Sequence, residues 1–320
     1  MMKIASGVSS YEDFSFRGAR RQTFKTMKSL LKILIPTKFH GGLARYYFMV
    51  RELVRLWQAA LCVSWQWQFK SGGRPHRLPA TLIVSLTSYP PRFGTLSLTL
   101  RSLLRQTVKA DRTILWIADA DIPVLPKAVT DLRAAGLEIR ATDDIRSYKK
   151  IIPALNAFPD AFICTADDDV YYWPTWLEQL VDDTSMTERI VTCHRAHKIT
   201  VDRQGRFRPY KQWLLDVHDR DKSQLLFPTG AGGVLYPPGI LRHTADDRET
   251  AFTLCPVGDD IWLYWICRRN GATYKTVGHW RDLVLWRGTQ NQCLWLGNFN
   301  LGGNDTQIRK MAERYGYPAG

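Results

Sequence analysis

The 320-residue sequence lacks paired cysteines, a long uncharged run and any internal repeat. None of its six cysteines belongs to a C-x-x-C pair, so we interpret them as reduced, mostly buried thiols of a cytoplasmic protein. The uncharged stretch over residues 56–69 has 14 residues, fewer than the roughly 20 that a membrane-spanning helix needs. Met1 is not followed by a basic stretch, an apolar run and a small-residue cleavage site, so we expect no secretory signal.

Acidic residues are scarce in residues 1–77, where 3 Asp or Glu face 14 Lys or Arg. Residues 78–320 hold 27 Asp or Glu and 30 Lys or Arg. The net charge is therefore +11 in residues 1–77 and +3 in residues 78–320. A nucleic-acid-binding protein would carry its basic excess through the body of the chain, so we expect no nucleic-acid partner.

Residues 1–77 are predicted to form a basic helical extension. Residues 20–35 read as a short amphipathic helix, and residues 43–69 as a longer one that combines Arg with Trp and Phe. Such a helix suits a membrane surface, at the cytoplasmic face where the lipids are anionic. The alternative is a helix that packs on the body of the chain or on a second copy in a homo-oligomer. Residues 71–75 read as a linker.

Residues 78–320 are predicted to form one α/β domain. Strands alternate with helices, which indicates a mainly parallel central sheet flanked by helices, with ligands bound beyond the carboxyl ends of its strands. The expected strands are residues 81–86, 112–118, 137–140 and 161–165, and the expected helices are residues 96–106, 126–135 and 150–157.

Asp167, Asp168 and Asp169 directly follow the last of these strands. Three adjacent carboxylates repel one another and are costly to bury unpaired, so a divalent cation with oxygen ligands is their natural partner. If the backbone stays extended, Asp167 and Asp169 face one side and Asp168 the other. The alternative is a solvated acidic turn.

A second acidic pair, Asp259-Asp260, precedes a predicted helix over residues 261–268, where one of the two could serve as the N-cap. The glycine-rich run at residues 230–233 is not followed by the lysine of a phosphate-binding loop. Its glycines let the backbone approach a sugar closely, or else form a tight turn. Similarly, Asn304 or Asp305 is expected to cap the last helix.

These motifs, in this order, resemble bacterial glycosyltransferases of the GT-A fold, close to the family-2-like superfamily. The resemblance covers residues 81 to about 310. The matching segments are Ser85 to Arg92 after the first strand, Asp119 after the second, Asp144 with Tyr148-Lys149-Lys150, the D-x-D motif at Asp167-Asp168-Asp169, Phe227 to Tyr236, and Gly258 to Trp262.

The resemblance implies a metal-dependent, inverting glycosyltransferase of cell-surface polysaccharide synthesis. Its donor is a nucleotide sugar, by default a UDP-sugar, and its acceptor a glycan or lipid-linked glycan. It assigns Asp260 as the catalytic base and Asp259 as its acidic neighbour, and Asp167, Asp169 and His279 as ligands of Mn²⁺ or Mg²⁺. It implies donor contacts for Thr87, Tyr89, Arg92, Asp119, Asp144, Lys149, Lys150, Asp167 and Asp168, and sugar or acceptor contacts for Gly232, Gly233 and Trp262.

Two alternatives stay open at this point. A nucleotidyltransferase acting on sugar phosphates shares the α/β layout, but it needs a basic glycine-rich loop where this chain has Thr87 to Arg92. A non-catalytic sugar-binding protein would explain the 12 Trp residues, but not two separated acidic motifs.

Overall fold

The computed structural model describes residues 40–69, 72–242, 248–278, 281–289 and 302–318, and every structural statement below concerns these residues. The chain divides into two compact units, Met1–Val54 and Arg55–Gly320. A long helix, α2 (His40–Phe69), confirms the helix predicted over residues 43–69. The helix predicted over residues 20–35 lies outside the described part.

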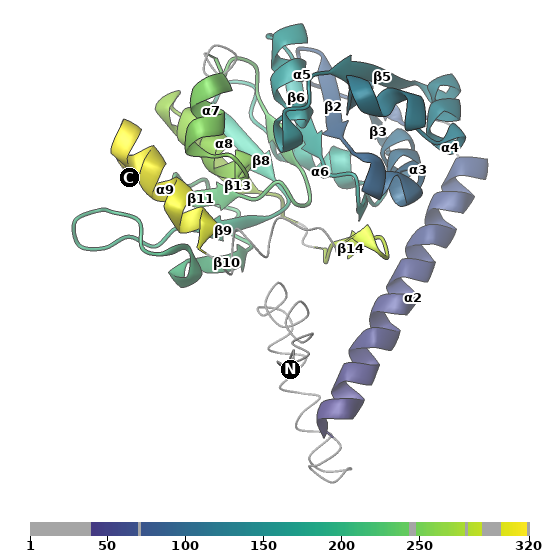
Figure 1. The fold of residues 1–320 in the computed structure, drawn as a ribbon, viewed down its shortest axis with the longest axis horizontal. Coiled ribbons are helices and arrows are strands. Elements are labelled where there is room, and N and C mark those ends of the chain that lie inside the picture. Colours follow the sequence, from purple (N-terminus) through teal and green to yellow (C-terminus); the bar gives the residue numbers. More distant parts are fainter. Residues whose placement is uncertain (1–39, 70–71, 243–247, 279–280, 290–301, 319–320) are drawn as a thin grey trace, which may run out of the picture. The chain divides into compact units, whose positions relative to one another are not determined.

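A seven-stranded sheet forms the centre of the second unit, in the order β13-β8-β12-β6-β2-β4-β5 (Figure 1). All its neighbouring pairs are parallel except the two that β12 makes with β6 and β8. The mainly parallel sheet predicted from the alternation of strands and helices is therefore confirmed. Its strands are β2 (Leu82–Thr87), β4 (Arg112–Ala118), β5 (Leu137–Thr142), β6 (Phe162–Ala166), β8 (Ile190–Cys193), β12 (Val234–Tyr236) and β13 (Thr273–Thr276).

Helices cover both faces of this sheet, because alternate side chains of its central strands enter two different cores. In β2, Leu82, Val84 and Leu86 pack with helices α3 and α6, whereas Ile83 packs with α5 and α8. The helices are α3 (Phe93–Leu104), α4 (Lys127–Thr130), α5 (Ile152–Ala157), α6 (Trp176–Asp183), α7 (Arg248–Leu254), α8 (Asp259–Arg269) and α9 (Gly303–Tyr315).

Three predicted helices differ in extent from the observed ones. Helix α3 begins three residues early, directly after a 3₁₀ turn (η2, Pro90–Arg92) that the two prolines favour. The helix predicted over residues 126–135 is α4 followed by a 3₁₀ helix (η4, Asp131–Ala135). The one predicted over residues 150–157 is α5, preceded by a 3₁₀ helix (η5, Arg146–Lys150), because Pro153 suits only the first turn of a helix.

Two expected N-caps are wrong. Gly258 caps α8 and Gly302 caps α9, so Asp259 and Asp260 lie inside the first turn of α8, and Asp305 inside that of α9. The Asp305 carboxylate instead accepts a hydrogen bond from the backbone of a distant residue, Tyr210 (2.7 Å).

Smaller sheets complete the unit. Strands β9 (Ala196–Lys198), β10 (Leu214–Val217) and β11 (Leu226–Pro228) form an antiparallel sheet, and β7 (Val170–Tyr171) pairs with β14 (Val284–Leu285). Strand β1 (Arg74–Pro75) pairs in parallel with β3 (Val108–Lys109), so the linker prediction for residues 71–75 is wrong at its end. Gly73 permits this pairing, since a Cβ there would overlap the Gln106 carbonyl oxygen.

No helix in the described ranges is both long enough and apolar enough to cross a membrane.

The pairing of β1 with β3 predicts that two adjacent glycines respond differently to the same substitution. Gly73→Ala forces a Cβ into backbone atoms that cannot move independently, and should lower the free energy of unfolding by about 1–3 kcal/mol. Gly72→Ala meets no atom within 4 Å and should change it by no more than about 0.5 kcal/mol. Urea unfolding of both variants measures this, and equal losses would contradict the pairing.

Candidate active site

Polar residues follow four parallel strands at one edge of the central sheet. Because β5, β4, β2 and β6 run in the same direction, their carboxyl ends meet there. Asp119 follows β4, Ser88 follows β2 and Asp167 follows β6, while Asp144 lies two residues beyond β5. This is the edge at which open α/β sheets bind their ligands.

The ammonium group of Lys150 joins the two acidic motifs at this edge. Lys150 Nζ lies 3.3 Å from Asp167 Oδ1, after β6, and 3.2 Å from Asp259 Oδ2, in the first turn of α8. Lys150 is buried, and its backbone carbonyl accepts a hydrogen bond from Ser85 Oγ of β2 (2.6 Å). A residue of η5 thus connects motifs that lie about ninety positions apart in the sequence.

Crowding of these charges shifts the pKa values of Lys150 and Asp260. Burial alone would lower the pKa of Lys150, but Asp259, Asp167 and Asp260 outweigh it and raise that pKa, so the ammonium stays charged. Burial and the neighbouring Asp259 carboxylate raise the pKa of Asp260 to about 7, against the opposing effect of Lys150. A carboxylate that titrates near neutrality can accept a proton from a substrate and return it to water.

Gly230 fits between Lys150 and Asp260. Its backbone N–H donates a hydrogen bond to Asp260 Oδ2 (3.0 Å). A Cβ at this position would lie 2.9 Å from Asp260 Oδ1 and 3.0 Å from Lys150 Nζ. The absence of a side chain therefore lets the ammonium and the carboxylate approach the turn after β11.

Arg92 is the second cation of the site. Its Nη1 atom contacts Asp169 Oδ2 and lies 3.1 Å from Asp168 Oδ1, and Ser88 Oγ donates to Asp168 Oδ2 (2.5 Å). Burial opposes the charge on Arg92, but Asp169 and Asp168 outweigh it and raise its pKa. Burial also raises the pKa of Asp168.

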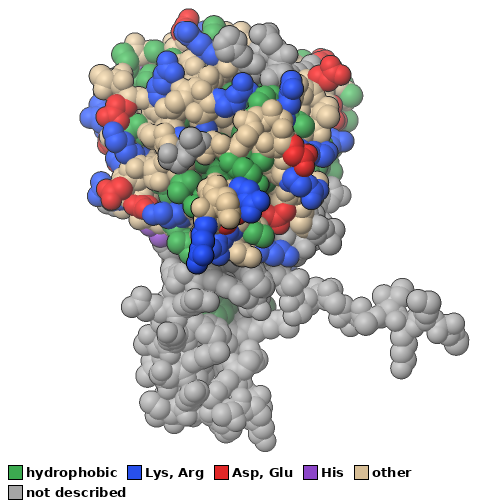
Figure 2. All heavy atoms as spheres, turned by 90° about the vertical axis from the view of Figure 1, so that its left-hand side faces the viewer, with side chains coloured by type: hydrophobic (Ala, Val, Ile, Leu, Met, Phe, Trp, Pro, Cys, Tyr) green, Lys and Arg blue, Asp and Glu red, His purple; other side chains and the backbone are tan. Residues whose placement is uncertain are grey.

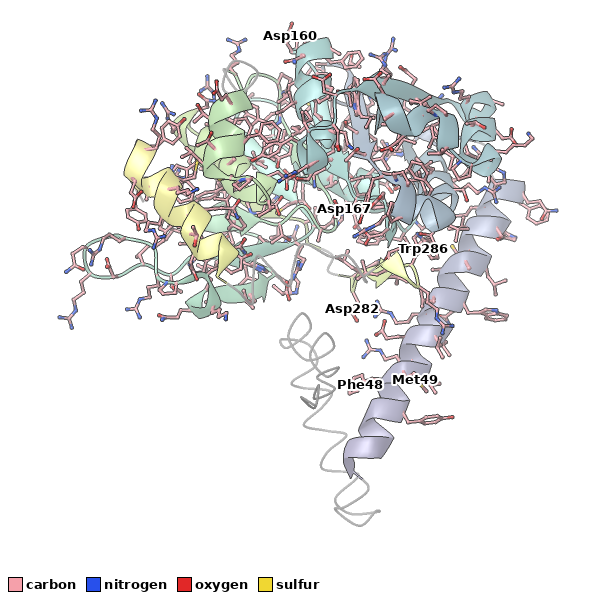
Figure 3. The ribbon with its side chains drawn as sticks, in the orientation of Figure 1. Phe48, Met49, Asp160, Asp167, Asp282 and Trp286 are labelled. Atoms are coloured by element: carbon pink, nitrogen blue, oxygen red, sulfur yellow. The ribbon has the colours of Figure 1, made fainter. Side chains whose placement is uncertain are left out.

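This pairing corrects the expectation that Asp167 and Asp169 share one side. Strand β6 ends at Ala166, and the chain turns at Asp168 and Asp169, so the alternation of an extended strand no longer applies. Asp168 and Asp169 share Arg92, whereas Asp167 faces Lys150. The turn is held at its start by the N–H of Asp167, which donates to the Tyr172 hydroxyl (2.7 Å). Asp167, which is half-buried, is labelled in Figure 3.

The two clusters contain more negative than positive groups. Five carboxylates (Asp167, Asp168, Asp169, Asp259 and Asp260) surround two cations, Arg92 and Lys150. Within the described ranges, no three His, Cys, Asp or Glu side chains converge on one metal position. Mg²⁺ is nevertheless commonly held by one or two carboxylates together with substrate phosphates. The donor set and the excess negative charge therefore fit a divalent cation.

The other predicted donor contacts line the same edge but lie outside the two clusters. Lys149 Nζ donates to Asp144 Oδ1 (2.8 Å), which lowers the pKa of Asp144, so consecutive lysines point to different partners. Asp119 is exposed in a 3₁₀ helix (η3, Asp119–Val124). The Thr87 hydroxyl donates a hydrogen bond to a backbone carbonyl of β4 (2.8 Å). The Tyr89 ring lies beside Arg92, whose Cζ atom is 5.9 Å from the ring centre.

Three predicted sugar-binding residues have structural partners of their own. Gly233 packs against Trp176, because a Cβ there would lie 2.5 Å from the indole ring, and Gly232 O accepts a hydrogen bond from Trp176 Nε1 (2.6 Å). Both glycines have positive φ, 96° and 100°, in a tight turn that the Gly233 N–H closes on Gly230 O (3.1 Å). Trp262 has no exposed surface and packs edge-to-face on Tyr148, so it belongs to the core in this structure. His279 lies outside the described residues.

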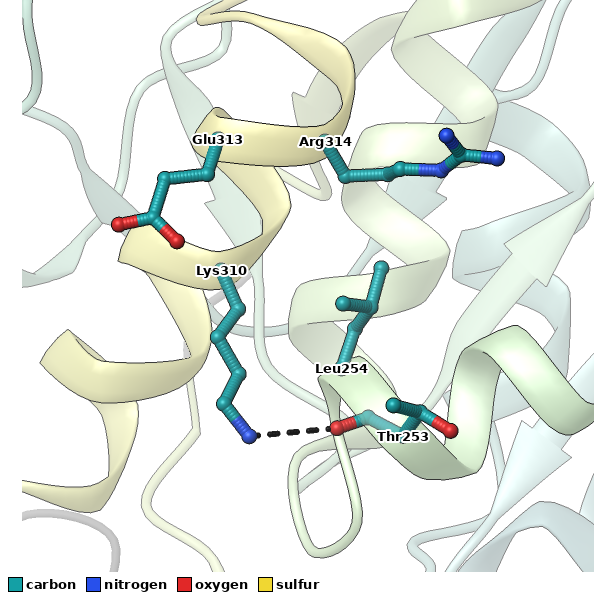
Figure 4. A pocket seen from close by; sticks show the side chains of 5 residues that line it. All are labelled: Thr253, Leu254, Lys310, Glu313 and Arg314. Atoms are coloured by element: carbon teal, nitrogen blue, oxygen red, sulfur yellow. Dashed lines mark hydrogen bonds between the residues drawn. The ribbon is translucent and has the colours of Figure 1, made fainter.

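Sequence reasoning did not single out Ser88 or Gly230. Both lie in segments that resemble the family, but nothing in the sequence shows that Ser88 holds Asp168 or that Gly230 holds Asp260. A hollow between the end of α7 and α9 is separate from these clusters (Figure 4), and is lined by Thr253, Leu254, Lys310, Glu313 and Arg314.

No protein-family model and no curated protein matches the chain. Similar solved structures include 4-diphosphocytidyl-2C-methyl-D-erythritol synthase from Anaerococcus prevotii, at 12% identity and a TM-score of 0.40 over 62% of this chain and 87% of that one. GalNAc-T7 with UDP, GalNAc and Mn²⁺ has 14% identity and a TM-score of 0.39 over 70% and 48%. Glucosyl-3-phosphoglycerate synthase from Mycobacterium tuberculosis, with Mn²⁺, UDP and glucosyl-3-phosphoglycerate, has 13% identity and a TM-score of 0.40 over 75% of this chain and 82% of that one. Likenesses this weak assign neither a reaction nor a ligand to this chain.

The position of Lys150 predicts that its charge stabilises the fold. Lys150→Met leaves buried carboxylates facing one another and should lower the free energy of unfolding by roughly 3–5 kcal/mol at pH 8. The loss should be smaller at pH 5, because Lys150 no longer lowers the raised pKa of Asp260, so this carboxyl binds a proton in the folded variant that the unfolded chain does not bind. Lys127→Met removes an exposed i,i+4 pair with Asp131 and should cost at most about 0.5 kcal/mol. Urea unfolding at both pH values measures this, and equal losses in the two variants would contradict it.

Proposed function

We propose that this chain is a glycosyltransferase that moves a sugar from a nucleotide-sugar donor to a glycan or lipid-linked acceptor, with inversion at the anomeric carbon. The observation that carries the proposal is the Lys150 ammonium, which brings Asp167 and the pair Asp259-Asp260 to one site at the ligand-binding edge of the sheet. Glycosyl transfer needs two acidic groups with different tasks, one beside the departing diphosphate and one beside the acceptor.

Asp260 is the proposed base. The acceptor hydroxyl gives its proton to the Asp260 carboxylate, its oxygen forms a bond to the anomeric carbon, and the bond from that carbon to the diphosphate oxygen breaks. The pKa of Asp260 near 7 suits this proton transfer. Asp259 keeps Lys150 in place, and the Gly230 N–H fixes the orientation of the Asp260 carboxylate.

The donor is proposed to lie along the carboxyl ends of β5, β4, β2 and β6. Asp119, Asp144, Thr87 and Tyr89 would contact the nucleoside, by default uridine, because they line the edge beyond the two clusters. Arg92, Lys149 and Lys150 would face the diphosphate. Gly232 and Gly233 remain proposed neighbours of the acceptor sugar, whereas the buried Trp262 does not.

A divalent cation, Mn²⁺ or Mg²⁺, is proposed as the cofactor. The resemblance implies Asp169, Asp167 and His279 as its ligands. Asp169 contacts Arg92 and Asp167 faces Lys150 in this structure, so both carboxylates would exchange these partners for the cation when it binds. When bound, the cation supplies positive charge to the diphosphate as negative charge develops on it. The excess of carboxylates over cations in the two clusters supports this role, since a diphosphate alone would add negative charge to a site that already carries too much.

Product analysis with a panel of nucleotide sugars tests the reaction. We expect release of nucleoside diphosphate with transfer of the sugar to an acceptor. A nucleotidyltransferase would instead convert the nucleotide sugar and added pyrophosphate to nucleoside triphosphate and sugar phosphate, and a sugar-binding protein would give no product. Asp260→Asn should lower the transfer rate by about 100-fold to 10,000-fold and leave donor binding intact, because only the base is lost. The exposed Asp131→Asn is the control and should keep full activity. Full activity in Asp260→Asn would exclude it as the base.

Chelation tests the cofactor. Removal of divalent cations with EDTA should lower nucleoside diphosphate release by at least about 100-fold, since the cation contributes several kcal/mol to stabilising the departing diphosphate. Added Mn²⁺ or Mg²⁺ should restore the rate. The reference is the rate in the same buffer without EDTA. Undiminished turnover in EDTA would show that Arg92 and Lys150 suffice.

A further inference from the structure

The outward face of the C-terminal half of α2 is strongly apolar. Trp57, Leu61, Trp65 and Phe69 follow one another at intervals of four residues and so form one stripe along the helix. Their exposed fractions are 67%, 49%, 53% and 64%. Soluble proteins rarely leave a contiguous row of large apolar side chains in water, so the stripe indicates a surface that contacts something else.

The opposite face of the same helix is packed on the body of the second unit, so the stripe cannot turn inward. Ala59 and Val63 are buried against Trp286, which Figure 3 labels beside α2. Arg55 forms an ion pair with Asp282 (3.2 Å). Near the end of α2, the Trp67 ring lies against two guanidinium groups. The Cζ atoms of Arg101, in α3, and Arg105, directly after α3, are 5.3 Å and 4.3 Å from the ring centre. Packing on the second unit thus accounts for one face of α2, whereas the stripe lies on the exposed face.

The stripe carries no charge, and basic residues precede it in the sequence. Residues 56–69 contain no Asp, Glu, Lys or Arg, and the polar residues between the stripe positions are neutral. Residues 1–54 hold ten Lys or Arg against three Asp or Glu. On the face of the second unit that carries α9, by contrast, basic and acidic side chains are interspersed (Figure 2). Trp and Phe beside an excess of basic residues suit the interfacial region of an anionic bilayer.

We infer that Trp57, Leu61, Trp65 and Phe69 form a docking surface for an anionic lipid bilayer, with this half of α2 lying in the plane of the membrane. A second copy of the chain fits less well, because pairing two such helices would bring two strongly basic segments together, whereas anionic lipid neutralises them. The inference goes beyond the proposed function and does not depend on the reaction.

Flotation of the full-length chain with lipid vesicles tests the docking surface. The probes are vesicles of phosphatidylcholine alone and vesicles that also contain phosphatidylglycerol. We expect the wild-type chain to float with the anionic vesicles and the fraction bound to fall when salt is raised. Trp57→Ser/Trp65→Ser should bind at least ten times more weakly. The control Val124→Ser/Met186→Ser removes two apolar side chains of similar exposure, 59% and 52%, outside α2 and should bind as the wild type does.

Unchanged flotation of Trp57→Ser/Trp65→Ser would overturn the inference. So would a wild-type chain that ignores both kinds of vesicle and sediments as a dimer, with the double variant a monomer, because the stripe would then bind a second copy. Equal urea unfolding midpoints for the two double variants establish that the mutated stripe has not unfolded the chain. Because these residues lie outside the proposed active site, nucleoside diphosphate release from a soluble donor should stay at the wild-type rate, so a failed reaction and a failed docking surface give different results.

Discussion

The Lys150 ammonium group is the interaction on which the site depends. Asp167 directly follows β6, and Asp259 is the first residue of α8. Their negative charges would repel each other if no cation lay between them. A single buried cation between them makes this approach tolerable. Burial and the Asp259 carboxylate raise the pKa of Asp260 against the effect of Lys150, so the crowding that needs Lys150 for stability also gives Asp260 the pKa that the proposed base requires. The stability of the site and its proposed chemistry therefore depend on the same small set of charges.

Much of the first half of the sheet could be predicted, because its strands are short apolar runs separated by helical patterns. Residues 112–118 form β4 as expected, and β2 and β6 are shifted by one residue. The second half was harder, because β8 and β12 are only four and three residues long and their order is set by pairing across the sheet rather than by local pattern. The antiparallel insertion of β12 between β6 and β8 has no local signal.

The types of residue in the candidate site were easier to predict than the directions in which their side chains point. The acidic motifs stand out as charges beside apolar segments, but nothing in Lys149-Lys150 shows that one lysine reaches Asp144 and the other the centre of the site. The chain turns after β6, so the side chains of the three aspartates do not alternate as they would in an extended strand. The resemblance implies a sugar or acceptor contact for Trp262, yet its place on the inner face of α8 buries it completely. Each of these outcomes depends on tertiary packing, which local sequence does not report.

The central claim is that the two acidic motifs form one electrostatic unit, and the titration of Asp260 tests it most directly. Carboxyl carbon NMR of the selectively labelled chain would follow this group in the wild type and in Asp167→Asn. Because the Asp167 carboxylate adds to the rise in the pKa of Asp260, the account predicts a midpoint near 7 in the wild type and a lower one in the variant. An ordinary acidic midpoint in the wild type, or the same midpoint in both proteins, would contradict it.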